Sequence, residues 1–327
     1  MKKVLLASTA LIGFAGMAAA DVTLSGSGRF GLVYGDDGTT SDTVLSYRLR
    51  FNIDASTETD SGVKFGGRIR LQYDAGDTVD DDSDADTYYQ GAAEVNAAMI
   101  YAETAGFRFE LGNANTAFDS LATLYNAELG FIGTTFGSYN QFGFDAYSSG
   151  PYGEGLANRI GLFASYSVGD LVARLSYVDY DQTDDALNPI ASVLDEEVGI
   201  SLDYTAGAYK LGFGYVQNAN GAPDTDVYAL LGEYAMNDAT NIGLQFIGEN
   251  TATVDESTLT LYGNHKLASG LGLGAYIAGI DSDAVYANDY AIGLGASYDI
   301  GGATIAGTIQ QGFADETYAD LGISFSF

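Results

Sequence analysis

Hydrophobic and polar residues alternate along most of this chain, and the stretch 44–73 shows the pattern most clearly. Every second residue in its first half is apolar: Leu45, Tyr47, Leu49, Phe51 and Ile53. Its second half repeats the pattern with Val63, Phe65, Ile69, Leu71 and Tyr73. The other face carries five basic residues: Arg48, Arg50, Lys64, Arg68 and Arg70. Because strand side chains alternate between two faces, this hairpin has one apolar and one cationic side. The cations need water, so the apolar side must meet something else.

The same alternation predicts sixteen strands. We expect them at 22–34, 44–57, 62–74, 90–102, 106–112, 157–168, 170–181, 197–205, 208–218, 224–236, 240–249, 256–268, 270–281, 289–300, 303–313 and 317–327. Tight connections, such as those at 104–106, 168–170 and 268–270, alternate with longer acidic ones. Strands of about ten residues with this alternation of turns and loops are typical of a transmembrane β-barrel. The fold class predicted is therefore all-β, an antiparallel 16-stranded barrel.

The first 20 residues have the pattern of a secretory signal peptide. Lys2 and Lys3 precede an apolar run at 4–17, and Ala18 to Ala20 provide a small-residue cleavage site. A membrane anchor helix is the alternative, but the run is short for a span of about 20 residues. We therefore expect export and a mature barrel domain, 21–327, that begins at Asp21. The chain has no cysteine, so a disulfide framework is excluded.

Charge and composition exclude several classes of protein. The net charge is −31, with 44 acidic and 13 basic residues, which argues against nucleic acid as a partner. No segment after the leader offers 18 consecutive apolar residues, as a membrane helix would need. A soluble β-sandwich would also alternate, but it would not need a row of arginines on one face. Tyrosines near the strand ends fit the aromatic girdles of a membrane barrel, with Tyr101 among those expected to face outward.

Two segments break the alternation. Residues 74–86 are rich in aspartate, and Asp80, Asp82, Asp84 and Asp86 are candidate ligands for Ca²⁺, since hard cations prefer carboxylate oxygens. A solvated surface loop is the other interpretation, and the spacing matches no EF-hand. The second segment, 113–155, is long and rich in glycine and aromatic residues. Irregular segments of this length are usually functional or disordered, and the aromatic content argues against disorder. Residues 119–129 are expected to form a short helix.

The end of the chain adds a further signal. The sequence Asp320-Leu-Gly-Ile-Ser-Phe-Ser-Phe327 alternates to its last residue and resembles the C-terminal assembly signal of outer-membrane proteins. Together with the leader, the sixteen strands and the long loop after the fifth strand, the whole chain resembles the trimeric general-diffusion porins of Gram-negative bacteria, in their alphaproteobacterial (Rhodobacter-type) branch. The resemblance implies a homotrimer in the lipid of the outer membrane, which passes small hydrophilic solutes and ions without a required cofactor. It also implies that the third loop, 113–155, folds inward as a constriction.

These expectations predict a charge filter. One wall would carry the basic residues of three adjacent strands together with one from the fifth: Arg29, Arg48, Arg50, Lys64, Arg68, Arg70 and Arg108. Arg159 and Arg174 would extend it. The opposite side would carry the loop carboxylates Asp119, Glu128, Asp145 and Glu154. Counting from a turn at 59–60 places Arg50 level with Arg68. Charged lining residues set the selectivity of such pores.

Three alternative functions make different demands on the sequence. A sugar-selective porin would need an aromatic track, which Tyr88, Tyr89, Tyr125, Tyr139 and Tyr147 could supply. A hydrolase would need a nucleophile and a base. The only histidine, His265, shares its strand face with Leu259 and Leu261, and no catalytic constellation is visible, so an enzyme is not expected. A structural or adhesive surface barrel would leave the basic face unexplained.

Overall fold

A computed structural model describes residues 21–75, 93–137, 143–153, 155–183, 193–251 and 253–327. The strands are β1 (Asp21–Asp36), β2 (Ser41–Glu58), β3 (Lys64–Ala75), β4 (Glu94–Val95), β5 (Met99–Thr104), β6 (Phe107–Gly112), β7 (Ile160–Val168), β8 (Leu171–Asp179), β9 (Glu197–Ala206), β10 (Tyr209–Gln217), β11 (Asp226–Asn237), β12 (Thr240–Asn250), β13 (Asp255–Lys266), β14 (Leu271–Ser282), β15 (Tyr290–Asp299), β16 (Ala303–Gln311) and β17 (Thr317–Ser326). A short 3-10 helix, η3 (Ala219–Gly221), follows β10. Within these residues no helix is long and apolar enough to cross a membrane. The expected signal peptide lies outside the described residues.

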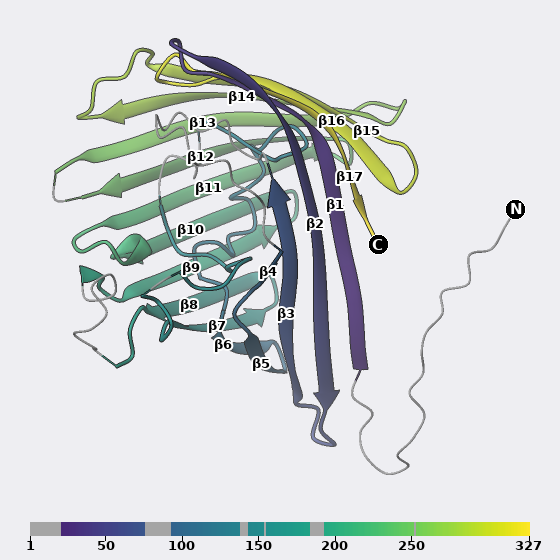
Figure 1. Cartoon of the computed structure of the whole chain (residues 1–327), viewed down its shortest axis with the longest axis vertical. Coiled ribbons are helices and arrows are strands. Elements are labelled where there is room, and N and C mark those ends of the chain that lie inside the picture. The colour runs from purple at the N-terminus through teal and green to yellow at the C-terminus, as the bar shows by residue number, and fades with distance from the viewer. Residues whose placement is uncertain (1–20, 76–92, 138–142, 154, 184–192, 252) are drawn as a thin grey trace, which may run out of the picture.

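The strands close into a single antiparallel barrel (Figure 1). Successive strands pair along the chain, and β17 pairs with β1, where Phe30 lies opposite Ile323. β4 and β5 both pair with β3 and are therefore two parts of one barrel strand. The predicted all-β, 16-stranded antiparallel barrel is confirmed. Among the described strands, closure leaves no open edge of the sheet, which is the condition for crossing lipid with strands.

The outward face of the barrel is apolar and exposed. Leu45, Ile100 and Leu294 have 75%, 57% and 62% of their surface accessible, and the pattern repeats around the barrel. A water-soluble monomer rarely exposes a continuous apolar band of this size. Tyr166, Tyr204, Tyr209 and Tyr298 are exposed on this face near strand ends, as the girdle prediction required. The two-sided character of residues 44–73 therefore extends to the whole barrel.

The strand formed by β4 and β5 contains a bulge that the alternation did not reveal. Leu71 pairs with Val95 but Gly67 pairs with Ile100, so the register shifts by one residue between them. The Asn96 side chain accepts a hydrogen bond from the backbone N–H of Arg70 at 2.6 Å and so replaces a ladder partner. A bulge of one residue moves the following side chains to the other face. Tyr101 accordingly faces the lumen, where its ring lies under Arg108, and the prediction that it faces outward was wrong.

The opening hairpin also has a different register from the one predicted. Its turn spans residues 59–63, with Gly62 at φ +80°, so that Glu58 pairs with Lys64. Arg50 therefore lies opposite Gln72, and Arg68 lies opposite Asp54. The expectation that Arg50 and Arg68 share a level was wrong, because the turn is longer than two residues. Each extra turn residue displaces the return strand along its partner.

Candidate functional site: a loop folded into the lumen

The segment that connects β6 to β7 lies inside the barrel (Figure 1). Phe118, Leu121 and Leu124 are buried against the inner wall. The wall residues that receive them come from β10, β11 and β12: Val216, Val227, Ala229, Leu231 and Ile247. Burying three large apolar side chains contributes several kcal/mol to holding the loop in place, at about 1.5–3 kcal/mol each. The expected helix at 119–129 was wrong: the segment forms a series of turns, closed by bonds such as Leu124 N to Leu121 O at 3.3 Å.

Glycines on the inner wall make room for this loop. A Cβ added to Gly214 would lie 2.7 Å from Leu121 and 2.8 Å from Phe118. A Cβ on Gly322 would lie 2.6 Å from the ring of Phe131. These distances are shorter than any normal carbon–carbon contact, so the two positions accept no side chain while the loop stays seated. The inner wall is therefore shaped to fit the loop.

The tip of the loop is fixed to the strands that close the barrel. Residues Leu129 and Thr134 form a small β-bridge, with Gly130 at φ +81° at its start. The carboxylate of Asp320 on β17 accepts hydrogen bonds from Phe131 N at 3.1 Å and Ile132 N at 3.4 Å. Arg29 on β1 donates to the carbonyl oxygen of Ile132 at 2.8 Å. A carboxylate and a guanidinium thus satisfy backbone groups that the irregular loop leaves unpaired.

Two glutamine side chains supply further anchors, one from β12 and one from β16, the neighbour of β17. Gln245 on β12 is fully buried, and its amide donates to the carbonyl oxygens of Thr123 at 2.7 Å and Leu124 at 3.0 Å. Gln310 on β16 donates to the Thr134 hydroxyl at 2.8 Å. Buried polar groups are tolerated only when they are hydrogen-bonded, so these amides fix the position of the loop backbone.

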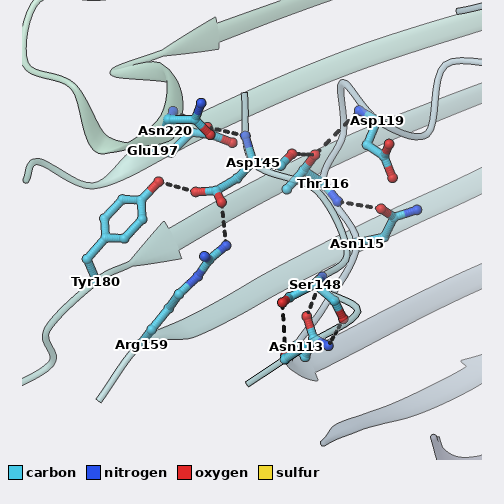
Figure 2. Close-up of polar contacts among 11 residues, drawn as sticks. Asn113, Asn115, Thr116, Asp119, Asp145, Ser148, Arg159, Tyr180, Glu197 and Asn220 are labelled. Carbon is cyan, nitrogen blue, oxygen red and sulfur yellow. Dashed lines mark hydrogen bonds and ion pairs between the residues drawn. The ribbon is translucent and has the colours of Figure 1, made fainter. Parts of the chain in front are cut away.

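The returning arm of the loop is held by a buried charged cluster (Figure 2). Asp145 has 7% of its surface exposed, and its carboxylate accepts hydrogen bonds from Arg159 and from the hydroxyl of Tyr180. Its backbone N–H donates to Glu197 at 2.9 Å, and its carbonyl oxygen accepts from Thr116. Asp145 therefore connects both arms of the loop to the wall through Arg159, just before β7, Tyr180, just after β8, and Glu197 on β9.

The two carboxylates of this cluster, Asp145 and Glu197, have different kinds of partner. Glu197, which is 1% exposed, accepts backbone N–H donors from Asp145 and Asn220, each at 2.9 Å. Within the described residues, Arg159 forms its ion pair with Asp145 and none with Glu197. Its guanidinium also lies 4.9 Å and 5.3 Å from the ring centroids of Tyr152 and Tyr180. The cluster thus contains two buried carboxylates close to one cation.

Four arginines of β2 and β3 form a ladder on the facing wall. Arg48 is paired with Asp74, and Arg68 is paired with Asp54 at 2.8 Å. Between them, Arg50 donates through Nε to the amide oxygen of Gln72, and Arg70 donates through Nε to Asn52 at 2.9 Å. The outer members of the ladder are therefore neutralised by carboxylates, whereas the two middle members are held by neutral amides.

The loop segment that meets this ladder is neutral. Ser149 accepts from Arg70 at 2.8 Å and from Arg50 at 3.4 Å. The guanidinium of Arg70 lies 4.6 Å from the ring centroid of Tyr147. Asn113 and Ser148 hold this arm of the loop together through paired hydrogen bonds of 2.8 Å and 2.9 Å (Figure 2). In the described residues, the ladder therefore contacts a hydroxyl and an aromatic ring of the loop.

The predicted loop acids lie in different places. Asp145 faces Arg159, as described above, instead of the ladder. Asp119 accepts a hydrogen bond from Tyr125, and burial raises its pKa, an effect that this bond and one from Asn115 partly oppose. Glu128 lines a cavity on the side of the loop toward the short turns. Glu154 lies outside the described residues.

The remaining predicted basic residues lie away from the ladder. Arg108 pairs with Glu110 at 2.6 Å and Glu103 at 2.8 Å, near the short-turn end of the barrel. Lys64 is exposed at the first residue of β3. Arg174 pairs with Asp203. The structure therefore brings together Arg29, Arg48, Arg50, Arg68 and Arg70, and separates them from Lys64 and Arg108.

Two cavities lie on the short-turn side of the loop. The larger, of about 980 Å³, is bounded by Glu128, Lys210, Glu233 and Lys266 among others. The smaller, of about 500 Å³, is lined by Arg29, Arg48 and Arg50, with Asp299 as its acidic residue. Both include Asp299 and Thr304. These spaces are lumen that the loop leaves open, and the smaller one has a cationic lining.

Sequence reasoning missed several residues that hold the loop. Asp320, Gln245, Gln310 and Glu197 all occupy inward strand positions and are buried. The signal that could have identified them is a polar side chain at an inward strand position that the loop covers and buries. Which strands the loop covers depends on barrel geometry, and the sequence does not state it.

The residues that suggested a sugar track, a catalytic histidine or a Ca²⁺ site lie as follows. Tyr125 bonds to Asp119 and Tyr147 stacks on Arg70, while Tyr88, Tyr89 and Tyr139 lie outside the described residues. His265 is exposed and contacts the Thr240 hydroxyl at 2.8 Å. The candidate Ca²⁺ ligands Asp80, Asp82, Asp84 and Asp86 lie outside the described residues. Within the described chain, no group of three or more acidic, histidine or cysteine residues could hold a metal ion.

Comparisons with known proteins agree with this geometry. A family model described as Gram-negative porin matches residues 7–325. A porin of Fuscovulum blasticum is 37% identical over 311 residues, with 94% of this chain and 100% of the relative covered. A porin of Rhodobacter capsulatus is 28% identical over 341 residues, with the same coverage. A solved mutant of the Rh. blastica porin has a TM-score of 0.81 and 37% identity, and covers 94% of this chain and 100% of that one.

Proposed function

Since this chain belongs to the Gram-negative porin family and forms a channel in the outer membrane, we propose that loop 113–155 sets the size limit of that channel. The observation that carries the proposal is the anchoring of the loop to several walls of the lumen. Apolar contacts reach β10, β11 and β12, and polar contacts reach β17, β12, β16 and β7 to β9. A 16-stranded barrel is otherwise wide enough to leave a broad aqueous channel.

The selectivity of the channel follows from the charged side chains that line its lumen. Water and hydrated ions occupy the lumen, and solutes pass beside the seated loop, through the space lined by Arg29, Arg48 and Arg50. A fixed field from Arg29, Arg48, Arg50 and Arg70 orients dipolar solutes and disfavours apolar ones. The predicted acidic counter-wall is replaced in this proposal by local carboxylates, Asp74 and Asp54, within the ladder itself. No step of this passage requires a catalytic residue or a cofactor.

Neutral polymer exclusion tests the size limit. Purified protein in a planar bilayer is exposed to polyethylene glycols of increasing size, and the size at which conductance stops falling is recorded. The variant Phe118→Ala/Leu121→Ala/Leu124→Ala removes the apolar anchors, at about 2–5 kcal/mol per side chain. We expect it to admit larger polymers and to conduct more. Val285→Ala, at a fully exposed position in another connection, is the matched control. Equal polymer cut-offs for wild type, the triple variant and the control would refute the proposal.

We also propose that the protein is a homotrimer, as the family resemblance implies. The exposed apolar face of β1 to β3 offers a surface for subunit contacts, with Leu24, Leu45 and Phe65 among its residues. Single-channel recordings should then show closures in three equal steps. A molar mass of one subunit in mild detergent, together with single-step closures, would contradict trimerisation.

A further inference from the structure

The two middle arginines of the ladder are arranged unlike the other two. Arg50 and Arg70 come from neighbouring strands, and each is oriented by a neutral amide, from Gln72 and from Asn52. Of the four ladder arginines, only Arg48 and Arg68 form an ion pair with a carboxylate in the part of the chain that the structure describes. Two guanidinium groups placed together repel each other, and neutral amides do not offset that repulsion.

The loop brings a third polar group to the same point. The oxygen of Ser149 accepts hydrogen bonds from both Arg70 and Arg50, at 2.8 Å and 3.4 Å. Because both arginines donate to this oxygen, neither bond uses the hydroxyl proton of Ser149, which remains able to donate. Tyr147 stacks on Arg70 at 4.6 Å and restricts its movement. Arg50, Arg70 and the Ser149 hydroxyl thus present donors at one point, and Gln72, Asn52 and Tyr147 hold the two guanidinium groups in place before any ligand arrives.

A solute can approach this point through the lumen. Arg50 lines the cavity of about 500 Å³ together with Arg29 and Arg48, while Asp299 is the acidic residue of that lining. Arg50 and Arg70 are both partly exposed, so their guanidinium groups are not sealed in the wall. Guanidinium forks match the geometry of paired oxygens on phosphate and carboxylate groups.

From this arrangement, which rests on the seated loop proposed above, we infer that Arg50, Arg70 and Ser149 form a binding site for small oxyanions of the phosphate type. The anion supplies the negative charge that the neutral partners of the two arginines do not. The site is half wall and half loop, so it exists only while the loop is seated. Its occupancy makes passage of such anions saturable, whereas chloride, which cannot bridge the two forks, passes without saturation.

Phosphate titration of the conducting channel tests the site. The full-length mature protein is reconstituted in a planar bilayer in KCl, at about 0.1 M so that charges are not fully screened, and inorganic phosphate is added at constant ionic strength. We expect a saturable fall in chloride current. Arg50→Gln and Arg70→Gln should each raise the half-saturating phosphate concentration about tenfold or more, as expected for loss of a charged hydrogen bond. Ser149→Ala should raise it about two- to tenfold.

The matched control is Arg68→Gln. It removes the same charge from the adjacent rung of the same strand, but from an arginine already paired with Asp54. We expect a clearly smaller rise in its half-saturating concentration than Arg70→Gln gives. Within the described residues, Arg68 makes no hydrogen bond at the site, although the Asp54 carboxylate that this change releases lies one rung from Arg70. Ser149→Ala lies in the loop and leaves every strand intact, so it reports on the site even if an arginine variant fails to assemble.

The possible results separate this inference from the size filter. A channel with the proposed polymer cut-off but no saturable phosphate effect would overturn the oxyanion site alone. The oxyanion site is also overturned if Arg68→Gln weakens phosphate binding as much as Arg70→Gln does, since the effect would then be one of general charge. Unchanged polymer exclusion after loss of the apolar loop anchors would instead refute the size filter.

Discussion

Removing the cation from the buried cluster at Asp145 should release the returning arm of the loop. In Arg159→Met the side chain keeps much of its apolar volume between Tyr152 and Tyr180 but loses its charge. Asp145, 7% exposed, would then lie beside Glu197 without its guanidinium partner. Breaking a buried ion pair from one side costs about 3–5 kcal/mol, since one charge stays buried and uncompensated. That cost lowers the ratio of seated to released loop by more than about 100-fold.

Single-channel recording measures this change. Arg159→Met should show larger mean conductance and frequent current fluctuations, as the arm that carries Tyr147 and Ser149 leaves the wall. The double variant Asp145→Asn/Arg159→Met removes both charges, and the new amide can still accept from Tyr180. It should return the current to near wild-type noise. If the single and double variants behave alike, the uncompensated charge of Asp145 does not control the loop, and the reasoning fails.

Four further outcomes are expected. Gly322→Val places carbon atoms where Phe131 packs, which costs about 1–3 kcal/mol of overpacking, and should increase current noise. Gly153→Val, which has open space around it, should not. Equal noise in the two variants would contradict the fit between loop and wall. Burial raises the pKa of Asp119 above its ordinary 3.8, so the Asp119 carboxyl holds its proton more tightly when the loop is seated than when it is released. The stability of the seated loop therefore falls as pH rises from about 4 through the raised pKa. Wild-type noise should therefore grow over that range and Asp119→Asn should be flat; identical profiles would reject this role. The mature chain, which lacks Lys2 and Lys3, keeps 11 basic and 44 acidic residues, and its net charge of −33 should give a modest cation preference that fades with salt. Reversal potentials showing anion preference at low salt would refute this expectation. Mass spectrometry of the protein from outer membranes should find Asp21 as the first residue, and a chain that still starts at Met1 would contradict the predicted cleavage.

Alternation along the chain was enough to predict the barrel, because lipid outside and water inside impose opposite demands on neighbouring side chains. It failed where one residue breaks the period. The bulge at Asn96 moves Tyr101 to the lumen, and it depends on a side chain-to-backbone bond to Arg70 that no periodicity encodes. The hairpin register failed for a related reason, because the length of the turn at 59–63 sets which arginines become neighbours.

The candidate site was predictable in its parts but not in its pairings. Basic side chains in a row on one strand face and a long aromatic loop were visible in the sequence. The partner of each charge was not, because it depends on which wall the loop meets. Asp145 was expected to face the arginines of β2 and β3 across the lumen, yet it is buried against Arg159. Ser149 carries no charge that would single it out in the sequence, although it is the loop residue that both middle arginines contact.

The seat of the loop tip has a consequence for the order in which the protein assembles. Ile132 is held by Arg29, on the first strand to leave the ribosome, and by Asp320, on the last. These strands become neighbours only when β17 pairs with β1. Before that pairing, the tip has no complete binding surface, and residues 113–155 cannot be fully seated. The channel is therefore narrowed only as its wall is completed, so that the final strand both closes the barrel and finishes the filter.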